Sequence, residues 1–313
     1  MRDVSLERRQ DSPRKKKGVS KMKFGIMTAL ITPMKADGTV NEECLVKVIE
    51  DQLAHGVHSL LALGGTGENM AVPQQARRQV LDIVVKTVNK RVPVVAGVVE
   101  LGVYDAIRCA QMSKEAGVDA LLVSTPFGAA TSLQGCLDFF AKIDEAVNMP
   151  ILIYNFPGRT GYNTTPDIVQ ALLDRVPNII GIKECAEKFD QTMQQIARFG
   201  DRIEVLSGNE YLAAWEMLIG AKGAILASSN LLPGQWVEMY DLAQARKADE
   251  LTRMGMKYHP LQKLLFKEQN PGPLKYAMSR HGFDAGSPLL PVCPISKSLE
   301  KELDDMMEKL GVL

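Results

Sequence analysis

Short apolar runs alternate with amphipathic helical patterns along most of this chain. The runs are rich in β-branched residues, and apolar positions recur between them at helical spacing, most clearly over residues 41–55, where Gly56 follows as a stop signal. Most runs begin roughly 25–35 residues apart, which is typical of repeated βα units. The strand candidates are residues 24–31, 59–63, 93–99, 120–124, 151–154, 179–183, 204–207 and 224–226.

This alternation predicts an α/β fold, a single (β/α)8 TIM barrel over residues 23–232. A doubly wound sheet is the competing architecture, but it usually has fewer strands, and no dinucleotide-binding glycine fingerprint opens the chain. From residue 233 onward the pattern is helical only, with a break at Asn270-Pro271-Gly272-Pro273. We therefore expect residues 233–313 to form a C-terminal helical extension packed on the barrel.

The first residues differ from the rest of the chain in charge. Residues 1–23 hold nine basic and three acidic side chains, including the run Arg14-Lys15-Lys16-Lys17. Such a run is compatible with anion binding or nuclear localisation. We expect residues 1–22 to be a disordered basic tail or an expression leader, because Met22-Lys23-Phe24 resembles a natural start.

Elsewhere the composition excludes several classes of partner. Lys plus Arg (37) equals Asp plus Glu (37), so no charge bias points to nucleic acid or to an anionic membrane. No apolar run approaches the roughly 20 residues that a membrane span needs. The five scattered cysteines suit a reducing compartment, which predicts a cytoplasmic protein. His55 and His58 lack a third ligand of suitable spacing, so we expect neither a metal nor another cofactor.

Lys183 lies where a buried strand is expected to end. Residues 178–184 (Asn-Ile-Ile-Gly-Ile-Lys-Glu) are too apolar and too short for a surface helix. Burial disfavours the charged form of an amine, and the neutral amine is the nucleophile of Schiff-base chemistry. A single lysine is more often a solvated surface charge. Because reactive groups of such barrels lie at the carboxyl ends of strands, Lys183 is nevertheless the candidate nucleophile.

The turn after the second strand candidate predicts an anion site. It reads Gly64-Gly65-Thr66-Gly67. Its backbone N–H groups can converge on one point, and Thr66 adds a hydroxyl. Taken alone, such a sequence is commonly no more than a tight turn. We nevertheless expect Gly65, Thr66 and Gly67 to bind the carboxylate of a substrate.

The fifth strand candidate adds Tyr154 at its end and Arg159 on the loop beyond. A tyrosine near an amine can transfer protons, and an arginine can hold a carboxylate through two hydrogen bonds. The competing interpretations are a half-buried core ring and a surface charge. Together with Lys183, however, these residues describe a site for a 2-oxo acid, whose ketone condenses with the lysine and whose imine stabilises a neighbouring carbanion.

From Phe24 to its end the chain resembles the dihydrodipicolinate synthase/N-acetylneuraminate lyase family. The resemblance implies an imine on Lys183, Tyr154 as acid and base, no cofactor, and a homotetramer built as a dimer of dimers. Further substrate contacts are expected from Asn209, Glu210 and Ile225. The matching segments are the turn at residues 64–68, Tyr154-Asn155 with Pro157 and Arg159-Thr160-Gly161, Gly181-Ile182-Lys183-Glu184, Ser207-Gly208-Asn209-Glu210, and Asn270-Pro271 with Pro273 and Lys275.

The chain departs from the synthases of that family at two places. Synthases carry two threonines where this chain has Gly65-Thr66, and a tyrosine pair where it has Phe127-Gly128; the second of those tyrosines reaches into the neighbouring subunit's site. Because acid–base assistance is commonly worth about 10²–10⁴-fold, we do not expect an intact synthase activity. Residues 98–102 also lack the asparagine of the synthases' lysine-feedback site, so feedback by lysine is not expected.

Arg159 separates the chain from the sialic acid lyase branch, which usually lacks an arginine there. We therefore expect a lyase that forms a Schiff base with pyruvate or another 2-oxo acid and acts on a 2-keto-3-deoxy sugar acid or a similar carboxylated substrate. Residues 128–130 are small and enlarge the pocket, so Arg159 would bind a distal acid group, with Asn209 and Glu210 for hydroxyls. The alternatives are dihydrodipicolinate synthase itself, which condenses pyruvate with aspartate semialdehyde, and a non-catalytic barrel that binds a carboxylate.

Overall fold

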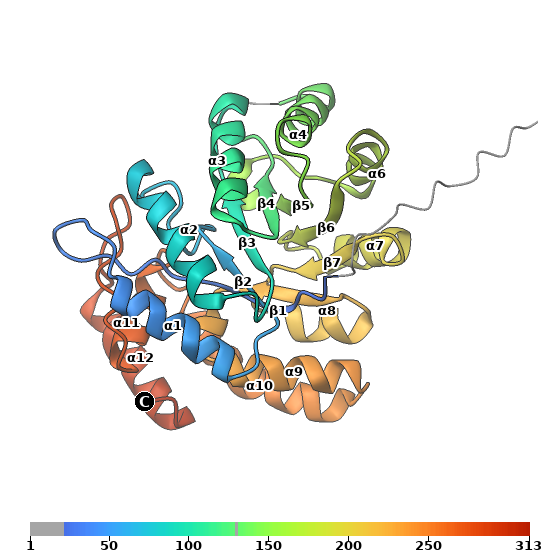
Figure 1. Cartoon of the computed structure of the whole chain (residues 1–313). Coiled ribbons are helices and arrows are strands. Elements are labelled where there is room, and N and C mark those ends of the chain that lie inside the picture. Colours follow the sequence, from blue (N-terminus) through green and yellow to red (C-terminus); the bar gives the residue numbers. More distant parts are fainter. Residues whose placement is uncertain (1–21, 129–130) are drawn as a thin grey trace, which may run out of the picture.

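The computed structural model describes residues 22–128 and 131–313 (Figure 1). Its parallel strands close into one barrel in the order β1 to β8, and β1 pairs with β8 in the register Gly25↔Gly223. All eight predicted strands are confirmed, with ends that shift by one to two residues in most cases. The strands are β1 (Gly25–Ala29), β2 (Ser59–Ala62), β3 (Val94–Val98), β4 (Ala120–Ser124), β5 (Ile151–Asn155), β6 (Ile179–Glu184), β7 (Glu204–Ser207) and β8 (Gly223–Leu226).

Helices surround the barrel, as Figure 1 shows. The helix expected over residues 41–55 is α1, for which Asn41 is the N-cap and accepts a hydrogen bond from the backbone N–H of Cys44. Gly56 follows it with a φ of 79°, a conformation that glycine adopts without strain. The helices between the strands are α1 (Glu42–Ala54), α2 (Gln74–Val88), α3 (Val103–Ala116), α4 (Leu133–Val147), α5 (Pro157–Thr160), α6 (Pro166–Arg175), α7 (Phe189–Phe199) and α8 (Ala213–Ile219).

After β8 the described chain is helical, as the sequence predicted. A short 3-10 helix (Ser228–Asn230) leads into α9 (Pro233–Gln244), α10 (Ala248–Leu264), α11 (Gly272–Arg280) and α12 (Lys297–Leu310). In Figure 1 these helices lie below the barrel, with α9 and α10 near α8 and α11 and α12 near α1. Helix α9 contacts both α8 and β1 and so completes the ring of helices around the strands. The division of the chain at residues 232 and 233 stays a prediction.

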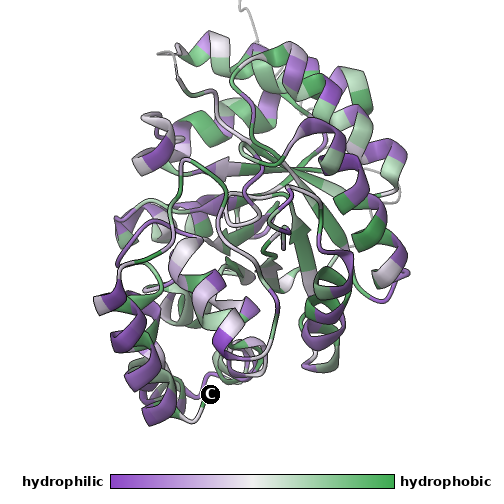
Figure 2. Cartoon of the chain, turned by 90° about the vertical axis from the view of Figure 1, so that its left-hand side faces the viewer, coloured by the Kyte–Doolittle hydropathy of each residue, from purple (hydrophilic) through white to green (hydrophobic). Residues whose placement is uncertain are grey.

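The core has two layers because successive strand residues point to opposite sides of the barrel wall. Met27, Leu61 and Leu206 are examples from the layer inside the barrel, whereas Ile26 and Ile182 belong to the layer between strands and helices. Figure 2 shows this organisation as apolar strands at the centre and helices with polar residues on part of their surface. The alternation turns Lys183 inward and its neighbours outward.

The predicted basic tail lies outside the described residues except for Met22, and so do Ala129 and Ala130 of the small-residue segment. Among the helices of residues 22–128 and 131–313, none is long and apolar enough to cross a membrane.

Candidate active site

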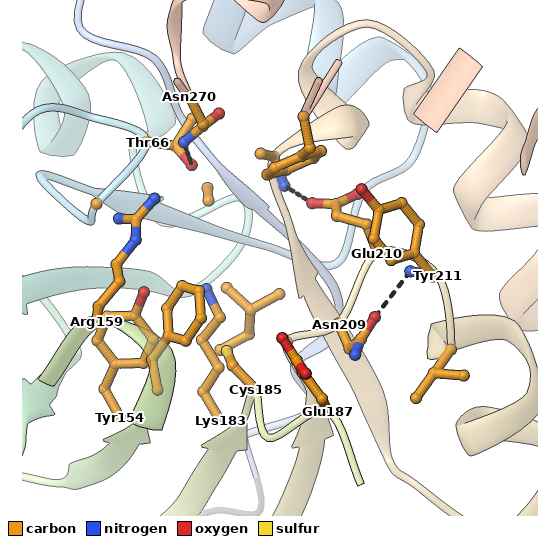
Figure 3. Close-up of a pocket in the computed structure, with 18 residues that line it drawn as sticks. Thr66, Tyr154, Arg159, Lys183, Cys185, Glu187, Asn209, Glu210, Tyr211 and Asn270 are labelled. Atoms are coloured by element: carbon orange, nitrogen blue, oxygen red, sulfur yellow. Dashed lines mark hydrogen bonds between the residues drawn. The ribbon is translucent and has the colours of Figure 1, made fainter. Parts of the chain in front are cut away.

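The carboxyl ends of the strands open onto a cavity of about 450 Å³ (Figure 3). All the site residues expected from the sequence except Gly67 line it. They come from the ends of different strands and from the loops after them, as is usual for this fold. The lining residues with polar or aromatic side chains are Thr66, Tyr154, Phe156, Arg159, Lys183, Cys185, Glu187, Asn209, Glu210, Tyr211, Phe266 and Asn270.

Lys183 and Tyr154 are direct neighbours across β6 and β5. The Lys183 Nζ lies 4.8 Å from the centre of the Tyr154 ring, and the two residues are 8% and 6% exposed. Burial raises the pKa of Tyr154, while the charges of Lys183 and Arg159 act in the opposite direction. The phenol therefore keeps its proton at neutral pH and can donate it to a group that leaves from the lysine.

A buried hydrogen-bond network ties the two strands together directly behind this pair. Asn155 Nδ2 donates to Glu184 Oε1 at 2.8 Å, and Gln191 Nε2 donates to Glu184 Oε2 at 2.9 Å. The backbone N–H of Ala186 also donates to Glu184 Oε1, at 2.8 Å. Burial raises the pKa of Glu184 and these donors lower it, beginning with Gln191. The network fixes the neighbours of the two reactive residues, which limits the movement of their side chains.

Gly208, directly after β7, leaves the space that the lysine side chain occupies. A Cβ at this position would lie 2.1 Å from Cys185 Sγ and 2.7 Å from Lys183 Cε. Both distances are far shorter than a van der Waals contact, so a larger residue would displace the lysine. We call Tyr154, Lys183 and Gly208 together the lysine wall. Sequence reasoning matched Gly208 as part of a motif but gave it no role.

The turn after β2, residues 64–68, forms the opposite wall, and we call it the β2 turn. Asn270 Nδ2 donates to Thr66 Oγ1 at 3.3 Å, so the hydroxyl proton of Thr66 remains for another acceptor. Gly67 does not line the cavity; its carbonyl accepts a hydrogen bond of 2.7 Å from Thr32 Oγ1. This position gives Gly67 a role in holding the turn, and its expected contact with a substrate stays a prediction.

Glu68 anchors the β2 turn to the C-terminal helices. Its Oε2 lies 2.5 Å from Lys275 Nζ in an ion pair whose side chains are 3% and 1% exposed. Its Oε1 accepts a hydrogen bond of 2.5 Å from the backbone N–H of Leu289. Lys275 belongs to a segment that matched the resembled family, and no signal within the sequence connected it with Glu68. The C-terminal helices thus position a wall of the cavity.

Arg159 lies against Gly65. A Cβ on Gly65 would be 2.5 Å from Arg159 Nη1 and 3.6 Å from the Tyr154 hydroxyl. The guanidinium carbon of Arg159 also lies 5.0 Å from the centre of the Phe156 ring, a cation–π contact. The guanidinium therefore fills the space that a threonine side chain at position 65 would need.

The third side of the cavity carries the other expected residues. Asn209 Oδ1 accepts from the backbone N–H of Tyr211 at 3.0 Å, which leaves its amide nitrogen as a donor. Glu210 accepts from the backbone N–H of Ala227 at 2.5 Å and from the hydroxyl of Ser228. Both carboxylate oxygens of Glu210 thus accept hydrogen bonds from residues at and after the end of β8, and its binding of substrate hydroxyls stays a prediction. Burial raises its pKa.

Two remaining residues complete the cavity. Ile225 of β8 contributes an apolar, buried surface to it. Glu187, on the loop after β6, lines the cavity from an exposed position and was missed by sequence reasoning. Its only signal is that it follows Lys183 by four residues. Among the described residues, no group of three or more His, Cys, Asp or Glu side chains is placed to hold a metal ion.

Behind Arg159 lies a second cavity, of about 350 Å³. It shares Gly65, Tyr154 and Arg159 with the first cavity, and Phe127 lies on its wall. Phe127 belongs to the segment at which the sequence departs from the synthases that it resembles. Its ring adds apolar surface without a proton to transfer. The departure noted in the sequence therefore lies next to the reactive residues.

A closed parallel barrel with a buried lysine and tyrosine at neighbouring strand ends defines a class I aldolase type of enzyme. The comparisons with known proteins identify the family within this class. Residues 22–310 match the Dihydrodipicolinate synthetase family. The chain belongs to this family, and it is a lyase.

Individual relatives cover nearly the whole chain. The 4-hydroxy-tetrahydrodipicolinate synthase of Teredinibacter turnerae is 34% identical over 92% of this chain and 99% of its own. That of Syntrophobacter fumaroxidans is 35% identical with the same coverage. A crystal structure of the chloride-inhibited dihydrodipicolinate synthase from Acinetobacter baumannii, complexed with pyruvate, has a TM-score of 0.90 at 30% identity and covers 93% of this chain and 100% of its own.

Proposed function

We propose that the protein forms a Schiff base between Lys183 and pyruvate and condenses it with aspartate semialdehyde. The observation that carries this proposal is the pair Lys183 and Tyr154 at the base of the cavity, with Nζ 4.8 Å from the ring centre. The names of the relatives and the pyruvate complex of the Acinetobacter baumannii enzyme support the choice of both substrates. They favour the synthase, which the sequence ranked second, over a sugar-acid lyase.

The chemistry follows from the positions of the residues. The amine of Lys183 attacks the ketone carbon of pyruvate, and the ketone oxygen leaves as water with one proton from the amine and one from Tyr154. The resulting protonated imine withdraws electrons, so the methyl carbon loses a proton to the Tyr154 phenolate and an enamine forms. This carbon bonds to the aldehyde carbon of the second substrate, whose oxygen takes up the proton from Tyr154. Water then hydrolyses the imine and frees Lys183.

Other residues would hold the substrates during these steps. The Thr66 hydroxyl, whose proton is free, would donate to the carboxylate of pyruvate together with backbone N–H groups of the β2 turn. Arg159 would bind the carboxylate of the aldehyde. Because Arg159 lies against Gly65 and near the Tyr154 hydroxyl, it also supplies a charge close to the tyrosine. We propose that this charge partly replaces the hydroxyl that is missing at position 65.

A second candidate is aldol cleavage or dehydration of a 2-keto-3-deoxy sugar acid. It is favoured by Gly65 and Phe127-Gly128, which lack the hydroxyl groups that the synthases of the resembled family carry there, and by the second cavity behind Arg159. The two candidates share the imine and differ only in the partner of the enamine. Steady-state kinetics with both substrates would decide between them.

The first experiment is reduction with borohydride in the presence of pyruvate, followed by peptide mass spectrometry. We expect an adduct on the peptide that carries Lys183. Lys183→Ala should lose the adduct and all turnover, whereas Lys188→Ala, a change at an exposed lysine nearby, should lose neither. A folded wild-type protein that gives no adduct would contradict the proposal and favour a non-catalytic carboxylate-binding barrel.

We further propose a homotetramer, a dimer of dimers, in the cytoplasm. Support for assembly comes from large apolar side chains that are exposed on the described surface, among them Met70 (64%), Leu101 (61%) and Tyr104 (80%). Multi-angle light scattering should give four times the mass of the 34.4 kDa chain. A monomer mass at micromolar concentration would contradict this expectation.

A further inference from the structure

Asn270 belongs to the segment just before α11 and contacts the β2 turn from the C-terminal part of the chain. Its Nδ2 donates a hydrogen bond of 3.3 Å to Thr66 Oγ1, which Figure 3 marks with a dashed line. Asn270 is 8% exposed and Thr66 is 7% exposed, so little water competes for this bond. Asn270 lines both cavities. Sequence reasoning matched it as part of a motif but gave it no role.

The direction of this hydrogen bond decides what Thr66 offers to the cavity. A hydroxyl has one proton to donate and can accept two hydrogen bonds. Because Asn270 donates, Thr66 keeps its proton, and no residue in the part of the chain that the structure describes accepts that proton. The residues on either side of Thr66 are glycines, so Thr66 supplies the one side-chain hydroxyl of the β2 turn. The side-chain donor for a substrate carboxylate on this turn therefore depends on Asn270.

The amide group of Asn270 is held in this direction although its oxygen gains nothing from it. The Oδ1 atom is buried and has no hydrogen-bond partner among the described residues, which is unfavourable for stability. In the reversed orientation Oδ1 would accept the Thr66 proton, and the hydroxyl would turn its lone pairs toward the carboxylate of a substrate. A buried polar atom without a partner is uncommon and is often found where function fixes a side chain.

We propose that Asn270 is a positioning residue, which keeps the Thr66 hydroxyl as a donor for the carboxylate of the 2-oxo acid that reacts with Lys183. This inference rests on the proposed function, since its ligand is that 2-oxo acid. A carboxylate accepts hydrogen bonds and donates none. Loss of the donor should therefore weaken the binding of pyruvate and change the later steps less.

The test measures borohydride trapping of pyruvate on Lys183 at increasing concentrations of pyruvate. The half-saturating concentration and the limiting rate of trapping are obtained separately. We expect Asn270→Ala to raise the half-saturating concentration about fivefold and to change the limiting rate less than about twofold. Asn178→Ala is the matched control and should leave both values unchanged. Its amide donates to Asp144 and Asn148 just before β6, at the amino ends of the strands.

A double-mutant cycle shows whether Asn270 acts through Thr66. Thr66→Val removes the hydroxyl and should raise the half-saturating concentration of pyruvate about tenfold. The double variant should then bind pyruvate as Thr66→Val alone does, because no hydroxyl is left to direct. Losses that multiply to about fiftyfold would overturn the inference. So would wild-type binding of pyruvate in either single variant.

Asn270→Asp keeps the shape of the side chain and reverses the hydrogen bond, so it carries the same test if the alanine variant does not fold. The ionised carboxylate accepts the Thr66 proton and adds a negative charge, so the half-saturating concentration should rise about 30-fold or more. In the Thr66→Val background only the repulsion of the charges remains, and the additional loss should be less than about tenfold. An equal loss with and without the Thr66 hydroxyl would contradict the inference.

The proposed function fails in a different way. If Asn270 does not act through Thr66, pyruvate is still trapped on Lys183 in the wild type, and only the cycle comes out differently. Absence of the adduct in the folded wild type would instead contradict the Schiff base itself.

Discussion

The two walls of the cavity hold their buried carboxylates in different ways. Glu68 on the β2 turn is paired with the ammonium group of Lys275, at 2.5 Å and almost without exposure. Glu184, behind the lysine wall, is held within the described structure by neutral donors, among them Asn155 and Gln191. The first wall therefore depends on a charge partner in a distant helix, and the second on the geometry of several weaker bonds.

The glycines of the two walls differ in the side chains that an added Cβ would meet. A Cβ on Gly208 would meet Cys185 and the middle of the Lys183 side chain, both of which are buried. A Cβ on Gly65 would overlap only the end of Arg159, an exposed side chain, and would touch the Tyr154 hydroxyl at an ordinary 3.6 Å. We therefore expect the lysine wall to be rigid and the β2 turn to adjust more easily. The four predictions below test this contrast.

The largest effect is expected from Lys275→Met. The change leaves Glu68 as a buried carboxylate without a counter-charge, which typically costs about 3–5 kcal/mol. The free energy of unfolding from urea titration should fall by that amount. Lys267→Met, which removes a lysine from a pair with Glu302 whose side chains are 51% and 43% exposed, should cost about 1 kcal/mol or less.

A double variant separates the loss of the pair from the loss of lysine packing. Glu68→Gln combined with Lys275→Met removes both charges, so it should recover a large part of the stability lost in the single variant. A double variant as unstable as Lys275→Met alone would show that the ion pair does not set the position of the β2 turn.

Gly208→Ala should affect chemistry more than any change on the β2 turn. The added methyl group overlaps Lys183 Cε, so the lysine must shift, and overpacking of this kind costs about 1–3 kcal/mol. We expect the rate of adduct formation with pyruvate to fall about 100-fold, as for a misplaced reactive group. Gly102→Ala is the control, because nothing lies within 4 Å of its Cβ. Equal adduct rates in the two variants would show that the lysine wall is not rigid.

Glu216→Gln tests how the buried carboxylates behind the lysine wall make stability depend on pH. Glu216 of α8 is fully buried; burial raises its pKa above 4.5, hydroxyls of Ser207 and Thr192 lower it, and the charge of Glu184 raises it. Because the folded state holds this proton more tightly, the stabilisation is complete below about pH 4.5 and is lost as the pH rises through the folded pKa.

In Glu216→Gln we expect the free energy of unfolding to depend less steeply on pH than in the wild type. Between pH 5 and 8 the unfolding free energy of the wild type should fall more steeply than that of Glu216→Gln, by at most about 1.4 kcal/mol per pH unit. Glu308→Gln, a change on the exposed surface of α12, should keep the wild-type slope. A Glu216→Gln profile parallel to that of the wild type would mean that the group does not titrate differently on folding.

The fold was predictable because its signals are local. Apolar runs at regular spacing located the strands, and the position of Lys183 at the end of one of them placed the candidate amine at the cavity. The same rule brought Tyr154 and Arg159 to the cavity. Each of these inferences needs only the chain near one strand and the general geometry of a barrel.

What could not be predicted depends on contacts between distant segments. Lys275 pairs with Glu68 across more than two hundred residues, and nothing in the spacing of either residue indicates it. Glu210 lines the cavity as expected, but nothing in the sequence indicates its hydrogen bonds to residues after β8. Glu187 lies on a loop without a periodic pattern. Side-chain direction and loop path decide these three cases, and neither follows from hydrophobic periodicity.

The smallest effect is expected from Gly65→Ala. Its Cβ would lie 2.5 Å from Arg159 Nη1, but the arginine can move away toward solvent, so the unfolding free energy should change by about 0.5 kcal/mol or less. The shift moves the guanidinium away from the acceptor carboxylate. We therefore expect the KM for aspartate semialdehyde to rise about threefold, while pyruvate forms its adduct at the wild-type rate. If adduct formation slowed as much as in Gly208→Ala, the β2 turn would be as rigid as the lysine wall, and Arg159 would have to be assigned to the imine step.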